Sequence, residues 1–199
     1  MTKSNVSPFQ LPGALAVFLP IWFVVAFGVG ASGSLARLPV PPPAIAVGLT
    51  VILALAIWRI PKIQAVVGNT GIGWMVAFHL VRIAAGGHFL VLYSRGVLPA
   101  EFALPAGWGD IAVGIAALPV LWFCLALQTS RQRNGLMLWN VFGLLDILLV
   151  LGNGIRLFLR DASLAEPFTT LPLALLPTMV VPIVIVTHLL IFFRLKGIR

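Results

Sequence analysis

Charged residues are scarce in this chain of 199 residues, of which only 9% are Asp, Glu, Lys or Arg. A soluble domain has roughly 25% charged and roughly 45–50% apolar residues, whereas this chain is 60% hydrophobic. So few charges cannot cover a surface that faces water. The composition therefore predicts an integral membrane protein whose main partner is the lipid bilayer.

Cysteine and the usual catalytic motifs are also lacking. The single cysteine, Cys124, cannot form an internal disulfide or a CxxC redox pair. No HExxH, Walker or catalytic Cys/His spacing occurs, and GVGASG at 28–33 lacks the strand and helix context of a dinucleotide-binding loop. These absences favour a protein that is not an enzyme and assign no metal site. The net charge of +8 comes mostly from residues that flank apolar runs, so we expect it to set topology rather than to bind nucleic acid.

What the sequence does contain is six long apolar runs. Each is close to the roughly 20 residues that a helix needs to cross about 30 Å of hydrocarbon, and none alternates as a barrel strand does. The sequence predicts an all-α transmembrane bundle of six helices in one domain over 1–199. The expected spans are about 11–31, 43–60, 72–94, 109–128, 135–159 and 170–193.

Two loop segments resemble each other in sequence. RGVLPAEFALP (95–105) and RDASLAEPFTTLP (160–172) both place Glu six residues after Arg, followed by Phe and then Leu-Pro. This suggests three helical hairpins in parallel repeat. The alternative is that loops at one face of the bilayer share turn chemistry.

Several polar residues lie inside the predicted spans. Arg82 is near the middle of the third span and Asp146 near the middle of the fifth. An unpaired arginine at the bilayer centre costs about 2.5–3.5 kcal/mol, so we expect an Arg82–Asp146 ion pair. His79 shares a helical stripe with Arg82, and Asn153 shares a face with Asp146. These four residues form the predicted ligand-binding or relay site, in which Arg82 holds an anion or sets the charge of Asp146 and His79 titrates. The ion pair alternatively serves only helix packing.

A second interpretation concerns His79 and His188, which have similar expected depths in the membrane. Two histidines on different helices, with Gly86 and Gly87 nearby, suit bis-histidine ligation of haem b. The favoured expectation is a protein without a cofactor, which is colourless when purified. The haem alternative requires a Soret band that disappears on substitution of either histidine.

A further polar cluster is predicted at the outer ends of the helices. Its members are Arg95, Glu101, Asp110, Arg156 and His88. Asp110 follows Trp108-Gly109, where a helix N-cap belongs, so we expect it to cap the fourth helix. The alternative is that Asp110 meets Arg156 or His88.

The stretch ALPAGWGDIAVG, the preceding arginine-bearing helix and the later NVFGLLD resemble small multi-pass bacterial membrane proteins of no assigned activity. The resemblance covers about 82–146 and implies a bacterial envelope protein, without activity, ligand or site. From the interior polar residues we predict binding or translocation of a small solute or proton. The alternatives are a haem b electron carrier and a structural or assembly subunit of a membrane complex.

The distribution of Lys and Arg predicts the topology. Eight flank the spans on one side, namely Lys3, Arg59, Lys62, Arg131, Arg133, Arg194, Lys196 and Arg199, and three on the other, namely Arg37, Arg95 and Arg160. The positive-inside rule places the first group and both termini in the cytoplasm of a bacterial inner membrane. Reporter fusions to each terminus in bacterial cells should both read cytoplasmic. A periplasmic reading at either terminus would contradict the topology.

Overall fold

The computed structural model describes residues 7–197. Lys3 and Arg199, which the topology prediction counts, lie outside the described residues. Helices and no strands occur in the described part, so the predicted all-α fold is confirmed. In chain order the elements are α1 (Gly13–Ala31), η1 (Ser34–Arg37), α2 (Pro42–Arg59), α3 (Pro61–Gly68), α4 (Ile72–Phe78), α5 (Val81–Ser94), α6 (Ala100–Pro119), η2 (Val120–Cys124), α7 (Ser130–Arg160), η3 (Ala162–Thr169), η4 (Leu176–Val180) and α8 (Val181–Gly197).

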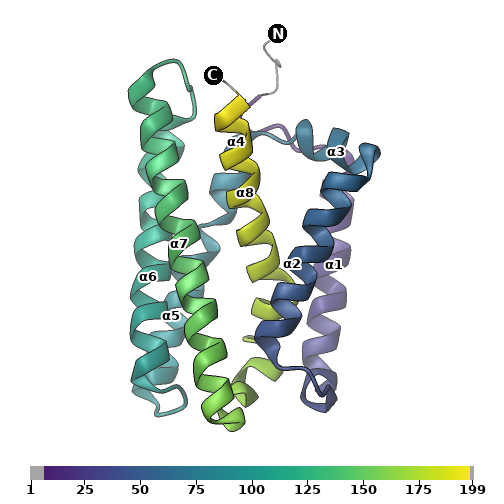
Figure 1. Ribbon diagram of the computed structural model, residues 1–199, viewed down its shortest axis with the longest axis vertical. Coiled ribbons are helices and arrows are strands. Elements are labelled where there is room, and N and C mark those ends of the chain that lie inside the picture. The colour runs from purple at the N-terminus through teal and green to yellow at the C-terminus, as the bar shows by residue number, and fades with distance from the viewer. Residues whose placement is uncertain (1–6, 198–199) are drawn as a thin grey trace.

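Six helical segments within residues 7–197 are long and apolar enough to cross a membrane. They are Gly13–Ala31, Pro42–Arg59, Ile72–Ser94, Ala100–Cys124, Ser130–Arg160 and Leu176–Gly197. These helices indicate a multi-pass membrane protein, as predicted. The start of α1 and the end of α8 lie at the same end of the bundle (Figure 1), as an even number of crossings requires. Which side is cytoplasmic, and whether the whole chain is one domain, stay predictions.

Helix α8 lies between two groups of helices (Figure 1). It packs against α7 and α4 on one side and against α2 on the other. Helix α1 is peripheral and buries only Ala26 and Gly30. It is attached to the region before α8 by the indole of Trp22, whose Nε1 donates to the backbone oxygen of Thr178 at 3.0 Å. Polar side chains carried by α5, α6, α7 and α8 therefore meet inside the bundle, away from α1.

The fourth span begins earlier in the chain than the sequence suggested. We expected a loop at 104–109 and a helix from 109, but α6 begins at Ala100, after Pro99, and includes Pro105. Proline and glycine are tolerated in membrane helices because neighbouring helices compensate for the backbone groups they leave open. The sixth span also starts later than expected, at Leu176 rather than at 170. The correction to α6 places Asp110 in the middle of a helix instead of at its start.

The similar segments 95–105 and 160–172 take different structures. The first runs through a turn into the first turn of α6, whereas the second contains η3. The parallel repeat stays a prediction.

The third span is interrupted between α4 and α5, at His79 and Leu80. Here the backbone N–H groups of His79 and Arg82 donate to the carbonyls of Val76 and His79, three residues earlier, at 3.0 and 3.1 Å. Such tighter 3-10 turns eclipse side chains three residues apart. The interruption therefore brings His79 and Arg82 onto the same side of the span.

Helices α5 and α6 are in close contact because glycines face each other. A Cβ atom at Gly86 would lie 2.4 Å from the carbonyl oxygen of Gly107, and one at Gly114 would lie 2.6 Å from the side chain of Ile83. Small residues at such positions let membrane helices approach closely. The same approach brings Arg82 of α5 within reach of α6.

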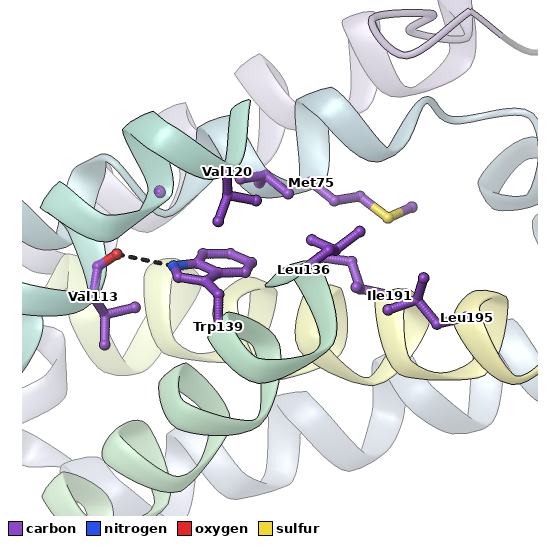
Figure 2. Close-up of a cluster of buried hydrophobic side chains, with 9 residues drawn as sticks. Met75, Val113, Val120, Leu136, Trp139, Ile191 and Leu195 are labelled. Carbon is purple, nitrogen blue, oxygen red and sulfur yellow. Dashed lines mark hydrogen bonds between the residues drawn. The ribbon is translucent and has the colours of Figure 1, made fainter. Parts of the chain in front are cut away.

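Two of the three apolar clusters in the described residues lie at opposite ends of α6 and α7. One contains Trp139, Val113, Leu136 and Ile191, and the indole Nε1 of Trp139 donates to the carbonyl of Val113 at 3.1 Å (Figure 2). The other contains Phe89, Phe102, Phe168, Leu157 and their neighbours. On α6, Asp110 lies between Ala106 of the second cluster and Val113 of the first. The polar residues of the bundle therefore form a layer between two apolar ones.

The α5–α6 contact predicts a large difference between two adjacent glycines. Gly86→Ala should lower the stability by about 1–3 kcal/mol, because a Cβ atom would overlap with backbone. Gly87→Ala should change it by less than about 0.5 kcal/mol, because nothing lies within 4 Å of a Cβ atom there. Thermal unfolding in detergent measures both. Equal melting temperatures for the two variants would contradict the close contact.

Candidate functional site

Arg82 lies at the centre of a buried polar cluster built by α5, α6 and α7. Its Nε donates to Oδ1 of Asp110 at 2.6 Å and its Nη1 to the carbonyl oxygen of Gly143 at 3.0 Å. Its Nη2 donates to Oδ2 of Asp146. We call these four residues the Arg82 cluster. The side chains of Arg82, Asp110 and Asp146 are 2%, 6% and 15% exposed, so the charges are largely removed from solvent.

Glycines allow this cluster to form. A Cβ atom at Gly109 would lie 2.0 Å from Oδ1 of Asp146, and one at Gly86 would lie 3.0 Å from Cβ of Asp110. Since neither position has room for a methyl group, the carboxyl group of Asp146 lies directly against the backbone of α6, and Cβ of Asp110 lies directly against the backbone of α5. The backbone of α5 and α6 thus fixes where the two aspartates sit around the guanidinium.

Two histidines lie in contact beside the cluster, and we call them the histidine pair. The rings of His79 and His188 are fully buried, with centroids 4.2 Å apart and planes at 47°. Nε2 of His79 is 3.1 Å from Oγ1 of Thr187, and Nδ1 of His188 is 2.9 Å from Oδ1 of Asn140. The amide of Asn140 also donates to the carbonyl of His188 at 3.1 Å, so this asparagine fixes both the ring and the backbone.

Gly143 joins the histidine pair to the Arg82 cluster. Its carbonyl accepts the hydrogen bond from Arg82, and a Cβ atom on it would lie 2.8 Å from Nε2 of His188. His79 is also one turn from Arg82 along the chain. The two groups form one polar layer across α5, α6, α7 and α8.

The outer-end residues form a separate, exposed network. Oε2 of Glu101 accepts from Arg156 at 3.2 Å and from Arg160 at 3.4 Å. Asn153 belongs to this network, because its Nδ2 donates to the carbonyl of Glu101 at 2.7 Å and its Oδ1 accepts from Arg156. Its predicted place beside Arg82 and Asp146 is therefore wrong. Seven residues of α-helix rise about 10 Å, which separates Asn153 from Asp146.

Asp110 also departs from its predicted place. We expected it in the outer cluster as a helix cap, but the N-cap of α6 is Pro99 and Asp110 pairs with Arg82. The sequence did identify the Arg82–Asp146 contact, which is present. It missed Asn140 altogether, although this amide is fully buried inside the fifth span.

The remaining outer-end residues lie elsewhere. Arg95 follows the last turn of α5, where its backbone N–H donates to the carbonyl of Val91. His88 lines a cleft of about 540 Å³ between α5 and the η3 region, together with Glu166 and Ser163. Near this cleft, hydrogen bonds from Ser163 hold the pKa of Asp161 below its usual value. Within residues 7–197, no hydrogen bond or ion pair joins these residues to the Arg82 cluster.

The histidine pair does not fit haem in this arrangement. Bis-histidine ligation places the imidazoles on opposite faces of a porphyrin, but these two rings are in contact and leave no space for a macrocycle between them. Among residues 7–197, no group of three or more His, Cys, Asp and Glu side chains could hold a metal ion.

The fold and the buried polar layer define a multi-pass helical membrane protein with charged groups in its interior. The chain belongs to the family described as domain of unknown function (DUF8737), whose model matches residues 40–196. The matched residues include α2 to α7 and the whole polar layer, and they begin after α1. No curated protein and no solved structure matches the chain.

The cluster predicts strong coupling between Arg82 and each aspartate. Arg82→Gln should lower the stability by about 3–5 kcal/mol, because it leaves two buried carboxyl groups without their cation. Asp110→Asn and Asp146→Asn should each cost less, because the other aspartate still balances the charge of Arg82. In each double variant with Arg82→Gln, the loss of stability should be smaller than the sum of the two single losses. This difference should be larger for Asp110 than for Asp146, because Asp110 is more buried. Thermal unfolding of the single and double variants measures the coupling.

The matched control is the pair Glu101 and Arg156, whose side chains are 57% and 55% exposed. Glu101→Gln and Arg156→Gln should show coupling below about 1 kcal/mol. Additive losses at the Arg82 cluster would show that the three charged residues do not act together.

Proposed function

We propose that this protein binds a proton at the Arg82 cluster and relays it within the membrane. The observation that carries the proposal is the composition of the cluster, in which one guanidinium faces two carboxyl groups. With both carboxyl groups ionised, the cluster has one negative charge in excess. A proton bound to either carboxyl group makes it neutral.

The excess charge matters because the cluster lies inside the bundle. Two unit charges 4 Å apart interact by about 4 kcal/mol at an effective dielectric of about 20, and an uncompensated charge in an apolar medium costs more. Arg82 can offset the charge of one carboxylate at a time. Ionisable groups of this kind inside a membrane protein are candidates for proton relays.

The packing supports a proton rather than a larger solute as the species bound. Gly86 and Gly109 border the cluster, and a methyl group on either would overlap with Asp110 or Asp146. A proton needs no additional volume. Asp146 is the more exposed of the two carboxyl groups, at 15%, and is therefore the group at which a proton exchanges with the outside of the cluster.

The competing interpretation is that the cluster only holds the helices together, as in an assembly subunit. Both interpretations require the ion pairs for stability, but only a relay requires a carboxyl group that binds and releases a proton. The bacterial inner membrane and cytoplasmic termini remain part of this proposal, as the resemblance and the distribution of Lys and Arg predict.

Proton flux into vesicles tests the relay directly. We expect the purified protein, reconstituted with a pH-sensitive dye inside and valinomycin to balance charge, to dissipate a pH gradient faster than protein-free vesicles do. Asp110→Asn and Asp146→Asn should each reduce the added flux by about 100-fold, the typical loss when a proton-transfer group is removed. Gly109→Ala, which displaces the Asp146 carboxyl without removing it, should also reduce the flux.

The matched control is Asp161→Asn, which changes a fully exposed aspartate outside the spans and should leave the flux unchanged. The proposal fails if the protein adds no flux, or if folded Asp110→Asn and Asp146→Asn variants conduct as well as the unmodified protein.

A further inference from the structure

Each ring of the histidine pair has one nitrogen without a hydrogen-bond partner. These atoms are Nδ1 of His79 and Nε2 of His188, and both are completely buried. Buried polar atoms in folded proteins nearly always have a partner. Two such atoms in a single pair of touching rings therefore point to a function.

The contacts of Asn140 determine which nitrogen of His188 carries the hydrogen. The Nδ2 group of Asn140 donates to the carbonyl of His188, so its Oδ1 faces the ring as an acceptor. Nδ1 of His188 must then be the donor. The unpartnered Nε2 has a free lone pair.

The contacts of Thr187 determine the opposite tautomer for His79. The hydroxyl of Thr187 donates to the carbonyl of Ile183 at 2.8 Å, as buried helix threonines commonly do. Its oxygen can then only accept from His79, so Nε2 of His79 is the donor. The unpartnered Nδ1 has a free lone pair as well.

We propose that His79 and His188 are a second proton-binding site, in which the two free lone pairs take up a proton in transit to or from the Arg82 cluster. The inference rests on the function proposed above. The proton adds to a lone pair of one neutral ring, which becomes an imidazolium, and later leaves from the same nitrogen. The ring centroids are 4.2 Å apart, so the two sites of protonation belong to rings in direct contact.

The residues around the histidine pair favour transient rather than permanent binding of a proton. Arg82 is the one permanent cation next to the pair among residues 7–197, and it repels a proton held there. Thr187 of α8 and Asn140 and Trp139 of α7 are uncharged, and no carboxyl group contacts either ring. The pair is therefore neutral at rest. It lies on the side of Arg82 toward α4 and the predicted cytoplasmic end.

Nitrogen NMR tests the resting state independently of flux. In protein labelled with ¹⁵N-histidine and placed in bilayers, we expect two neutral rings of opposite tautomer at neutral pH. His188 should carry its hydrogen on Nδ1 and His79 on Nε2. His88, the third histidine, is identified by its loss in His88→Gln. The same tautomer in both rings, or an imidazolium at rest, would overturn the proposal.

Two glycines of α7 test the link to the Arg82 cluster. A Cβ atom at Gly143 would lie 2.6 Å from Cε1 and 2.8 Å from Nε2 of His188, whereas nothing lies within 4 Å of one at Gly152. Gly143→Ala should therefore shift the His188 nitrogen resonances and lower the flux at least tenfold, which corresponds to about 1.4 kcal/mol. Gly152→Ala should do neither.

Substitution of the histidines separates this proposal from the previous one. His79→Gln and His188→Gln should each lower proton flux, as we also expect for Asp110→Asn. If both histidine variants fold and conduct normally while the aspartate variants do not, the histidine pair is not on the path and the Arg82 cluster proposal stands. If the unmodified protein adds no flux, the relay itself fails, whatever tautomers the rings have.

Discussion

The burial of one guanidinium determines most of this structure. Arg82 is 2% exposed in the interior of a bundle of apolar helices, where an unpaired cation is expensive. All three of its interactions come from other helices, with Asp110 on α6 and with Asp146 and the Gly143 carbonyl on α7. Helices α5, α6 and α7 must therefore keep a fixed register, because a shift of one turn would leave a charge unpaired.

Small residues make this register possible. Gly86 and Gly114 bring α5 against α6, and Gly109 and Gly143 leave the space that Asp146 and His188 occupy. The tight turn at His79 then places a histidine next to the guanidinium, where an unbroken α-helix would have turned it further away. Apolar clusters on either side separate this layer from the two ends of α6 and α7. The charges thus lie in a low-dielectric region, where a single proton changes their interaction energy substantially.

The sequence predicted those features that depend on composition or depth. Six apolar runs gave the helices, and the central positions of Arg82 and Asp146 gave their contact. Asp110 was misplaced because Pro105 and the glycines around Trp108 suggested a loop. In a membrane helix the same residues allow close packing, and the small residues Ala103, Gly107 and Gly114 on one side of α6 were the available signal. The sequence placed Asn153 beside Asp146 because helical periodicity puts both residues on one face of α7. Periodicity does not show that the partner of Asn153, further along the helix, is Glu101.

The central claim is that one guanidinium and two carboxyl groups bind one proton. Infrared spectroscopy of protein labelled with ¹³C at the aspartate carboxyl carbons tests it directly, because the chain has only three aspartates, Asp110, Asp146 and Asp161. We expect a labelled C=O band of a protonated carboxylic acid at neutral pH, lost in Asp110→Asn or Asp146→Asn and kept in Asp161→Asn. A spectrum that contains only ionised carboxylate bands for all three residues would contradict the account.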